Sequence, residues 1–160
     1  MKEIKLSEER AALVDDEDFS WLTQWYWGAS YQWGNYYAVR YIKINGHRTS
    51  LQMHREIMKC PKGLQVDHIN HNGLDNRRCN LRICTHQENH RNKLPKGKYP
   101  YLGICKRADG RLKCWHARIN YNKKGIDLGS YYTLEDAARA YDKAAKEYFG
   151  EFANLNFPNE

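Results

Sequence analysis

The chain has 160 residues, of which 41% are hydrophobic, so it can bury one modest core or two small ones. Lys and Arg number 26 against 19 Asp and Glu, and the resulting net charge of +7 indicates either a polyanionic partner such as nucleic acid or simply a solvated surface. No apolar run approaches the roughly 18 residues that a membrane span needs, and the first residues lack the apolar stretch of a signal peptide, so we expect a protein that acts inside a cell.

Residues 13–58 are predicted to be rich in β-strands, because aromatic and polar positions alternate there. Asn45-Gly46 separates two alternating stretches and predicts a hairpin turn, and Gly34-Asn35 indicates a second turn. The aromatic side chains favour the core of a small sheet over base stacking, since alternation is what a half-buried strand requires. This prediction covers Trp25, Trp27, Trp33, Tyr36 and Tyr37.

Residues 59–93 are dense in Asp, His, Asn and Arg, so burial alone does not explain their composition. Asp67 and His68 follow an apolar residue, Asn80 comes twelve positions after His68, and Asn89 comes nine positions after Asn80. Phosphodiester cleavage needs an activated water, a cation at the phosphate and a group that orients the base. An Asp-His pair and an Asn on a helix can meet these needs.

Four segments carry a resemblance to a known family. They read LQMHREIM, VDHIN, DNRRCNLR and THQENHRN, and in the last of them Thr85 and Glu88 begin a capped helix. Together they resemble the HNH, or ββα-metal, endonucleases of phage and intron-encoded homing enzymes. The resemblance implies a strand, a loop, a second strand and a helix that carry the site.

By that likeness His68 is the general base, and Asp67 and Asn89 bind one Mg²⁺ or a similar hard cation, with another divalent cation such as Mn²⁺ as the alternative. Asn80 braces the loop between the strands and so fixes His68. Many members of the family have His where this chain has Asn89, and His90 is the alternative ligand; a His ligand would favour Mn²⁺, Ni²⁺ or Zn²⁺.

Other polar residues of the segment receive weaker assignments. His54 is interpreted as structural or substrate-orienting, and His71 and His86 as solvent-facing or phosphate contacts. The arginines around the anchors are predicted to bind phosphates on either side of the cut, with surface solvation as the alternative. They are Arg77, Arg78, Arg82 and Arg91.

Residues 94–100 have the Pro, Gly and Lys content of a linker. Beyond them we predict three short strands, YLGICKR, CWHARINY and KGIDLGSY, with turns at Asp109-Gly110 and at 122–125. Thr133 and Asp136 then begin a helix that Gly150 ends. The expected unit is a three-stranded antiparallel sheet on one helix.

This last region resembles the DNA-binding domain of plant ethylene-response factors, the APETALA family, in the segments YLG, WHARI, LGSY, TLEDAARAYDKAA and ANLNFP. The resemblance implies a sheet that lies in the major groove. Cys105 and Asp127 stand where plant members often have Arg and Trp, which changes the expected base preference. Trp115 fits packing and groove contact equally. The implied DNA-binding residues are Lys106, Arg107, Arg111, Trp115, Arg118, Lys123 and Lys124.

The sequence therefore predicts an α+β protein with a nuclease domain at 1–93, a linker at 94–100 and a DNA-binding domain at 101–158. The expected function is that of a site-selective, metal-dependent homing endonuclease, a hydrolase acting on double-stranded DNA. The alternative is a non-catalytic, sequence-specific DNA-binding regulator. We expect a monomer, encoded by a phage or mobile element, in the cytoplasm of a bacterial host.

Overall fold

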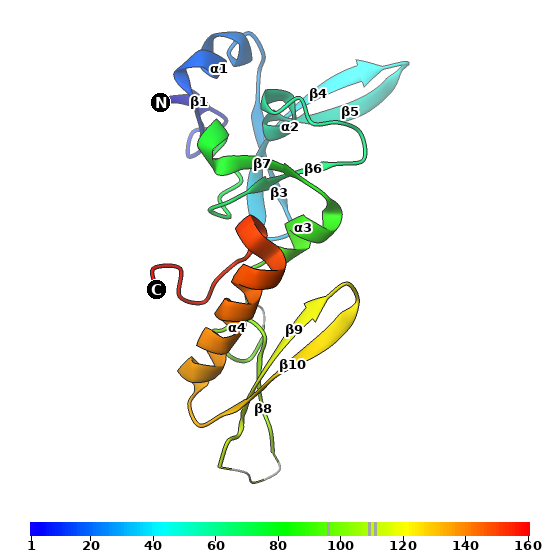
Figure 1. Cartoon of the computed structure of the whole chain (residues 1–160). Helices are drawn as coiled ribbons and strands as arrows, with labels where there is room; N and C mark the ends of the chain where they lie inside the picture. Colours follow the sequence, from blue (N-terminus) through cyan, green and yellow to red (C-terminus); the bar gives the residue numbers. More distant parts are fainter. Residues whose placement is uncertain (96, 109, 111) are drawn as a thin grey trace. The chain divides into compact units, whose positions relative to one another are not determined.

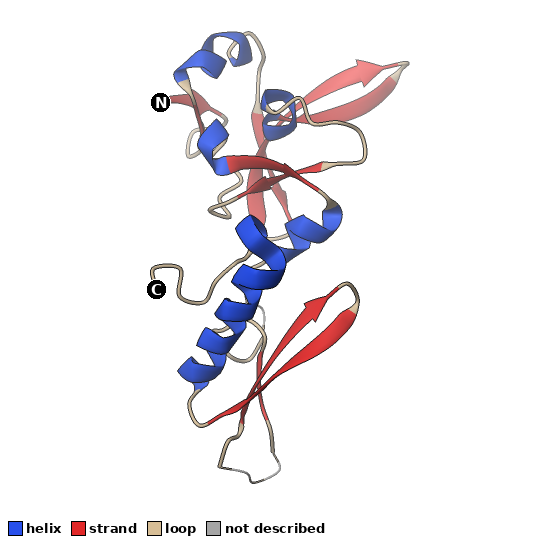
Figure 2. Ribbon diagram, viewed as in Figure 1, coloured by secondary structure: helices blue, strands red, loops and turns tan. Residues whose placement is uncertain are grey.

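The computed structural model describes residues 1–95, 97–108, 110 and 112–160. The chain divides into two compact units, Met1–Asn89 and His90–Glu160, and each has its own hydrophobic cluster. Several small sheets and few helices make up the structure (Figure 2), a mixture that agrees with the predicted α+β class. None of the described helices is long and apolar enough to cross a membrane. The predicted bounds of the two domains and the linker stay a prediction.

The first unit contains three small antiparallel sheets (Figure 1). Their strands are β1 (Lys2–Lys5) with β2 (Ala11–Val14); β3 (Gly28–Gln32), β4 (Asn35–Ile44) and β5 (His47–Gln52), in that order; and β6 (Gln65–His68) with β7 (Leu81–Cys84). The remaining elements are the helices α1 (Asp16–Leu22), α2 (Met53–Ile57) and α3 (His86–Arg91), and a 3-10 helix, η1 (Arg78–Asn80), before β7. The division between the units falls within α3.

Two tight turns shape the sheet of β3, β4 and β5. Asn45 (φ 49°) and Gly46 (φ 80°) join β4 to β5, which confirms the predicted hairpin. The other turn lies at Trp33 (φ 49°) and Gly34 (φ 91°), one position earlier than Gly34-Asn35. A two-residue turn of this kind needs two successive positive φ angles with Gly favoured at the second, so Asn35 instead begins β4.

The core of the first unit only partly follows the predicted aromatic pattern. Trp27 is buried, and its Nε1 donates a hydrogen bond of 2.9 Å to the carbonyl of Leu22. The prediction is wrong for Trp33, which is 89% exposed because it lies in the turn, and for Trp25, which lies before the sheet and is half exposed. Tyr36 and Tyr37 are half-buried. Alternation alone does not show where a strand ends.

The second unit consists of one antiparallel sheet and one long helix. Its elements are β8 (Ile104–Lys106), β9 (Trp115–Tyr121) and β10 (Lys124–Tyr131), in the order β10-β9-β8, then α4 (Leu134–Phe149) and the 3-10 helix η2 (Gly150–Phe152). The strands lie where the turn signals predict them, and Asn122 and Lys123, both with positive φ, form the turn before β10. The predicted turn at Asp109-Gly110 involves Asp109, which lies outside the described residues.

The sheet packs on α4 through a small apolar cluster that contains Ile119, Tyr141 and Phe149. The hydroxyl of Thr133 accepts a hydrogen bond of 3.1 Å from the backbone N–H of Asp136, which is the predicted N-terminal cap. Gly150, with φ 56°, ends the helix.

Candidate active site

The hairpin of β6 and β7 positions the first two predicted anchors. In its register Asp67 lies opposite Arg82, and His68 lies opposite Leu81. Because side chains alternate along a strand, Asp67 and Gln65 share one face, whereas His68 and Val66 share the other. Val66 and Leu81 belong to the core cluster, so His68 is on the core side of the hairpin. Both anchors are 6% exposed.

Arg82 holds the Asp67 carboxylate across the hairpin. Its Nε and one terminal nitrogen donate hydrogen bonds of 2.8 and 2.7 Å to Oδ2 of Asp67. Both side chains are largely buried, so the pair is protected from solvent screening. The structure thus gives Arg82 a partner within the protein, and its predicted phosphate contact stays a prediction.

Helix α3 brings Asn89 to the face of β6 that carries Asp67. The Asn89 Nδ2 donates a hydrogen bond of 2.7 Å to Oε1 of Gln65, two residues before Asp67 on the same strand face. The first turn is capped, because Thr85 N donates to the Glu88 carboxylate and Glu88 N donates to the Thr85 hydroxyl. The capped helix therefore holds the third anchor over the hairpin.

The imidazole of His68 lies among polar and aromatic groups. Its Nε2 is 3.4 Å from Oδ1 of Asn76, and its ring centre is 5.9 Å from that of Tyr37. Burial lowers the pKa of His68, while the bond to Asn76 and the neighbouring carboxylate of Asp67 oppose that shift. His68 is therefore neutral at pH 7, the form that a general base requires.

His54, from α2, packs edge-on against His68. The two ring centres are 4.9 Å apart, and Tyr37 lies 5.8 Å from His54. His54 is 4% exposed, and its Nδ1 has no hydrogen-bond partner among the described residues. Burial, with the nearby His68, lowers the pKa of His54 to about 3.

Asn80 ties together the loop between β6 and β7. Its Oδ1 accepts a hydrogen bond of 2.9 Å from the N–H of Asn70, and its Nδ2 donates one of 2.8 Å to the carbonyl of Asp75. Its own carbonyl accepts from the N–H of Ile69, directly after His68. These bonds are the kind that the bracing role requires; a part for Asn80 in catalysis stays a prediction.

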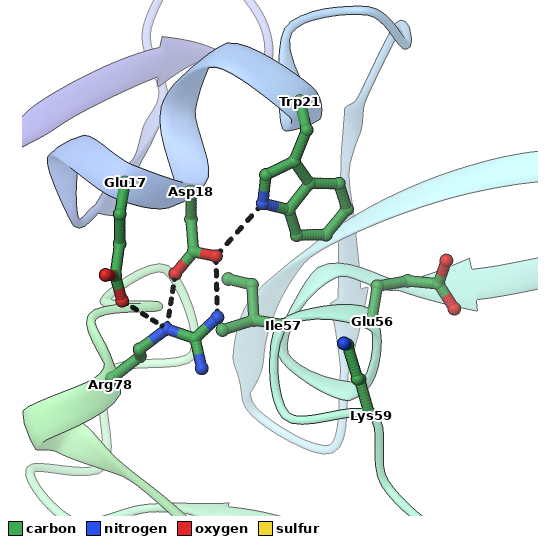
Figure 3. Close-up of a pocket in the computed structure, with 7 residues that line it drawn as sticks. All are labelled: Glu17, Asp18, Trp21, Glu56, Ile57, Lys59 and Arg78. Atoms are coloured by element: carbon green, nitrogen blue, oxygen red, sulfur yellow. Dashed lines mark hydrogen bonds and ion pairs between the residues drawn. The ribbon is translucent and has the colours of Figure 1, made fainter.

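Arg77 and Arg78 form ion pairs within the first unit. Arg77 donates to the carboxylate of Asp75 at 2.7 and 2.6 Å, and Arg78 donates to that of Asp18 at 2.8 and 2.7 Å. Figure 3 shows the guanidinium of Arg78 bonded to both Asp18 and Glu17, and these residues line an open pocket of about 650 Å³. Carboxylates of the same unit thus already neutralise the charges of these two arginines, and their predicted phosphate contacts stay a prediction.

The residues that the sequence assigns to DNA in the second unit differ in their surroundings. Lys106, Arg118, Lys123 and Lys124 are exposed on the sheet or its turn. Arg91 packs over the ring of Phe149 at 4.9 Å, and Trp115 meets the ring of Tyr99 edge-on at 5.0 Å, so both make internal contacts. Arg107 is half-buried, 3.9 Å from Asp127, and Arg111 lies outside the described residues.

The candidate metal ligands are few, and their donor atoms are oxygens. No group of three or more His, Cys, Asp or Glu that could hold a metal occurs in the described part of the chain. The carboxylate of Asp67 and the amide oxygen of Asn89 are a small, hard donor set, which suits Mg²⁺ because that ion keeps several waters. His90, the alternative ligand, is exposed and lies 3.1 Å from Lys93 Nζ.

Sequence reasoning missed two neighbours of His68. Asn76 lies in the loop that the motif spans, and Tyr37 comes from β4, far away in the sequence. No spacing rule connects β4 to this site. The sequence does indicate a third neighbour of His68, which is His54, through its place in the segment LQMHREIM.

Comparison with known proteins gives two kinds of likeness. A family model described as HNH endonuclease matches residues 58–91. An HNH endonuclease of Acanthamoeba polyphaga mimivirus is 32% identical over 146 residues, which are 84% of this chain and 72% of the relative.

Plant proteins match a shorter part of this chain. Dehydration-responsive element-binding protein 2A and an ethylene-responsive transcription factor, both of Arabidopsis thaliana, are 40% and 41% identical over 60 and 73 residues. The chain spans 17% and 36% of their lengths, and the matches cover 36% and 46% of this chain.

Proposed function

This chain belongs to the HNH endonuclease family, and we propose from that premise that it cuts duplex DNA at selected sites, with β6, β7 and α3 as its catalytic core. Enzymes of this family are DNA nucleases that typically use a divalent metal. The observation that carries the proposal is the hydrogen bond from Asn89 to Gln65, since it holds a helical amide over the strand face of Asp67. Strand and helix thus supply the two oxygen donors together.

In this mechanism neutral His68 takes a proton from the attacking water, and Asn80 holds the loop that orients it. Asp67 and Asn89 hold the cation, for which we propose Mg²⁺, and Arg82 fixes the Asp67 carboxylate. When bound, the cation would neutralise charge on the scissile phosphate and stabilise the leaving oxygen.

Site selection is assigned to the second unit. Its exposed cations, among them Arg118, Lys123 and Lys124, give the sheet a surface for DNA. A DNA-binding unit on the same chain raises the effective concentration of the nuclease at the target site. With one active site per chain, a monomer would cut one strand per visit. This behaviour fits a homing-type enzyme of a phage or mobile element in the cytoplasm of a bacterial host.

The test uses supercoiled plasmid and purified full-length protein. Wild type with Mg²⁺ is expected to produce open circles, and EDTA is expected to abolish them. His68→Ala should lower the rate by about 10²- to 10⁴-fold, the typical share of a general base. Asp67→Asn should also be inactive, whereas Asp16→Asn, which alters an exposed carboxylate of the same unit, should keep full activity. Salt-sensitive binding by wild type without any cutting would instead support the non-catalytic regulator.

The second metal ligand is tested by two adjacent substitutions. Asn89→Ala should raise the Mg²⁺ concentration needed for half-maximal cutting, and His90→Ala should leave it unchanged. The reverse result would make His90 the ligand. Circular dichroism of both variants would show whether α3 remains folded.

A further inference from the structure

The outer half of the β4–β5 hairpin has no third strand beside it. β3 pairs with β4 only as far as Val39, whereas β4 and β5 continue their pairing to Ile44 and His47. Residues 41–50, here called the outer ribbon, therefore form a two-stranded arm, which Figure 1 shows as the cyan extension of the sheet. Most of its residues are exposed. Two strands alone bury little apolar surface, so packing does not explain the length of this arm.

The charges of the outer ribbon are of one sign. Residues 41–50 contain Lys43 and Arg48 and no Asp or Glu. Lys43 and Arg48 are direct cross-strand partners, an arrangement that destabilises a sheet because like charges face each other. Neither forms an ion pair with a described residue.

An aromatic ring extends the same face. Tyr41 lies two residues before Lys43 on β4 and is half exposed, and the guanidinium of Arg48 stacks 3.9 Å above its ring. Arg40 makes a useful contrast, since it pairs with Glu56 at 3.2 Å and packs on Trp25 at 4.3 Å. The cation next to the body of the unit is thus neutralised, and those of the ribbon are not.

We propose that the outer ribbon is a DNA-binding arm, in which Lys43 and Arg48 contact phosphates of the duplex. A polyanion would turn the unfavourable cross-strand pair into two favourable contacts. A two-stranded ribbon also has the width that the major groove admits, and the stack of Tyr41 and Arg48 keeps the cationic face ordered. The inference rests on the proposed function in one respect, that duplex DNA is the substrate.

The test measures DNA binding in EDTA, so that no cutting occurs. The variant Lys43→Gln with Arg48→Gln is compared with Lys2→Gln with Lys5→Gln, which removes two exposed charges from β1 of the same unit. Each phosphate contact contributes about 0.9 to the slope of log K against log salt. The ribbon variant should therefore lower the slope by about 1.8, and the β1 variant should leave it unchanged. Equal slopes for wild type and the ribbon variant would overturn the proposal.

A second measurement uses the wild-type protein and does not depend on how the variant folds. Bound duplex should reduce acetylation of Lys43, read by mass spectrometry, but not that of Lys5. Equal acetylation of Lys43 with and without DNA would overturn the proposal, as would protection by single-stranded RNA or an acidic protein but not by duplex DNA.

The outcomes separate the ribbon from the catalytic proposal. If the wild type cuts DNA normally and the ribbon variant has the same salt dependence of binding, the proposed nuclease function stands and the proposed DNA-binding arm is rejected. If the wild type never cuts DNA but the slope of log K against log salt falls in the ribbon variant, the proposed catalysis is rejected and the proposed DNA-binding arm stands.

Discussion

Arg82 binds a carboxylate of its own chain, although its position among the anchors predicts a phosphate contact. Arg77 and Arg78 behave in the same way with Asp75 and Asp18. A sequence shows how many cations surround a motif but not which carboxylates lie across the strand or loop from them. For these arginines the fold supplies a carboxylate partner, and that ion pair already neutralises the charge that the sequence assigned to phosphate.

Removing Arg82 should therefore act on the fold as well as on activity. Arg82→Ala leaves the Asp67 carboxylate buried without its cross-strand cation, a change that typically costs about 3 kcal/mol. We expect that loss in the free energy of unfolding, measured by urea titration, together with slower plasmid cutting. If Arg82 mainly contacts phosphate, stability will be unchanged and only the salt dependence of binding will fall.

The anchors themselves show what spacing can predict. The motif placed Asp67 and His68 on a strand and Asn89 on a capped helix, and each lies on such an element. The alternation of the strand also follows from the sequence, and with it the separation of Asp67 from His68. Tyr37 and Asn76 could not be found in this way, because their closeness to His68 depends on how β4 and the loop pack.

At the scale of elements, local chemistry decides more than hydrophobic pattern. The Asn45-Gly46 turn, the cap at Thr133 and the end of α4 at Gly150 lie where the sequence predicts them, because each needs particular residues in a particular backbone conformation. The aromatic alternation failed at Trp33, since pattern does not distinguish a strand end from a turn.

Gly103, directly before β8, lies against the ring of Tyr141 on α4 with no room for a side chain. It has φ +70°, and an added Cβ would overlap the ring of Tyr141 and the carbonyl oxygen of Arg118. Gly103→Ala should thus cost about 3 kcal/mol, from backbone strain and overpacking together. Gly63→Ala is the control, because Gly63 has φ +89° but open space around it, and should cost about 1 kcal/mol. Equal losses in urea unfolding would show that the Tyr141 contact is unimportant.

At the scale of the whole molecule, the size and composition of the chain allow one modest core or two small ones. The structure has two hydrophobic clusters, one in each compact unit. The motif segments separate likewise, with the nuclease elements before α3 ends and the three-stranded sheet after it. The division between the compact units falls within α3, and the predicted domain bounds at 93 and 101 stay a prediction.

If the second unit reads the target, selectivity and cutting should respond to different substitutions. Arg118→Ala on the exposed face of β9 should reduce the preference for a selected target over random duplex by at least about fivefold, the value of one base contact. Nicking of a plasmid without the target should not change. Arg139→Ala, on α4, serves as the matched control. A fall in nicking with unchanged preference would assign Arg118 to general DNA affinity instead.

The open edges of the outer ribbon also affect the free protein. Strands with unpaired backbone N–H and C=O groups can add strands from a second copy and so begin aggregation. Charged side chains on such edges oppose this, since two approaching copies bring like charges together. Lys43 and Arg48 therefore oppose self-association of the free protein, and high salt, which screens that repulsion, is expected to weaken the protection.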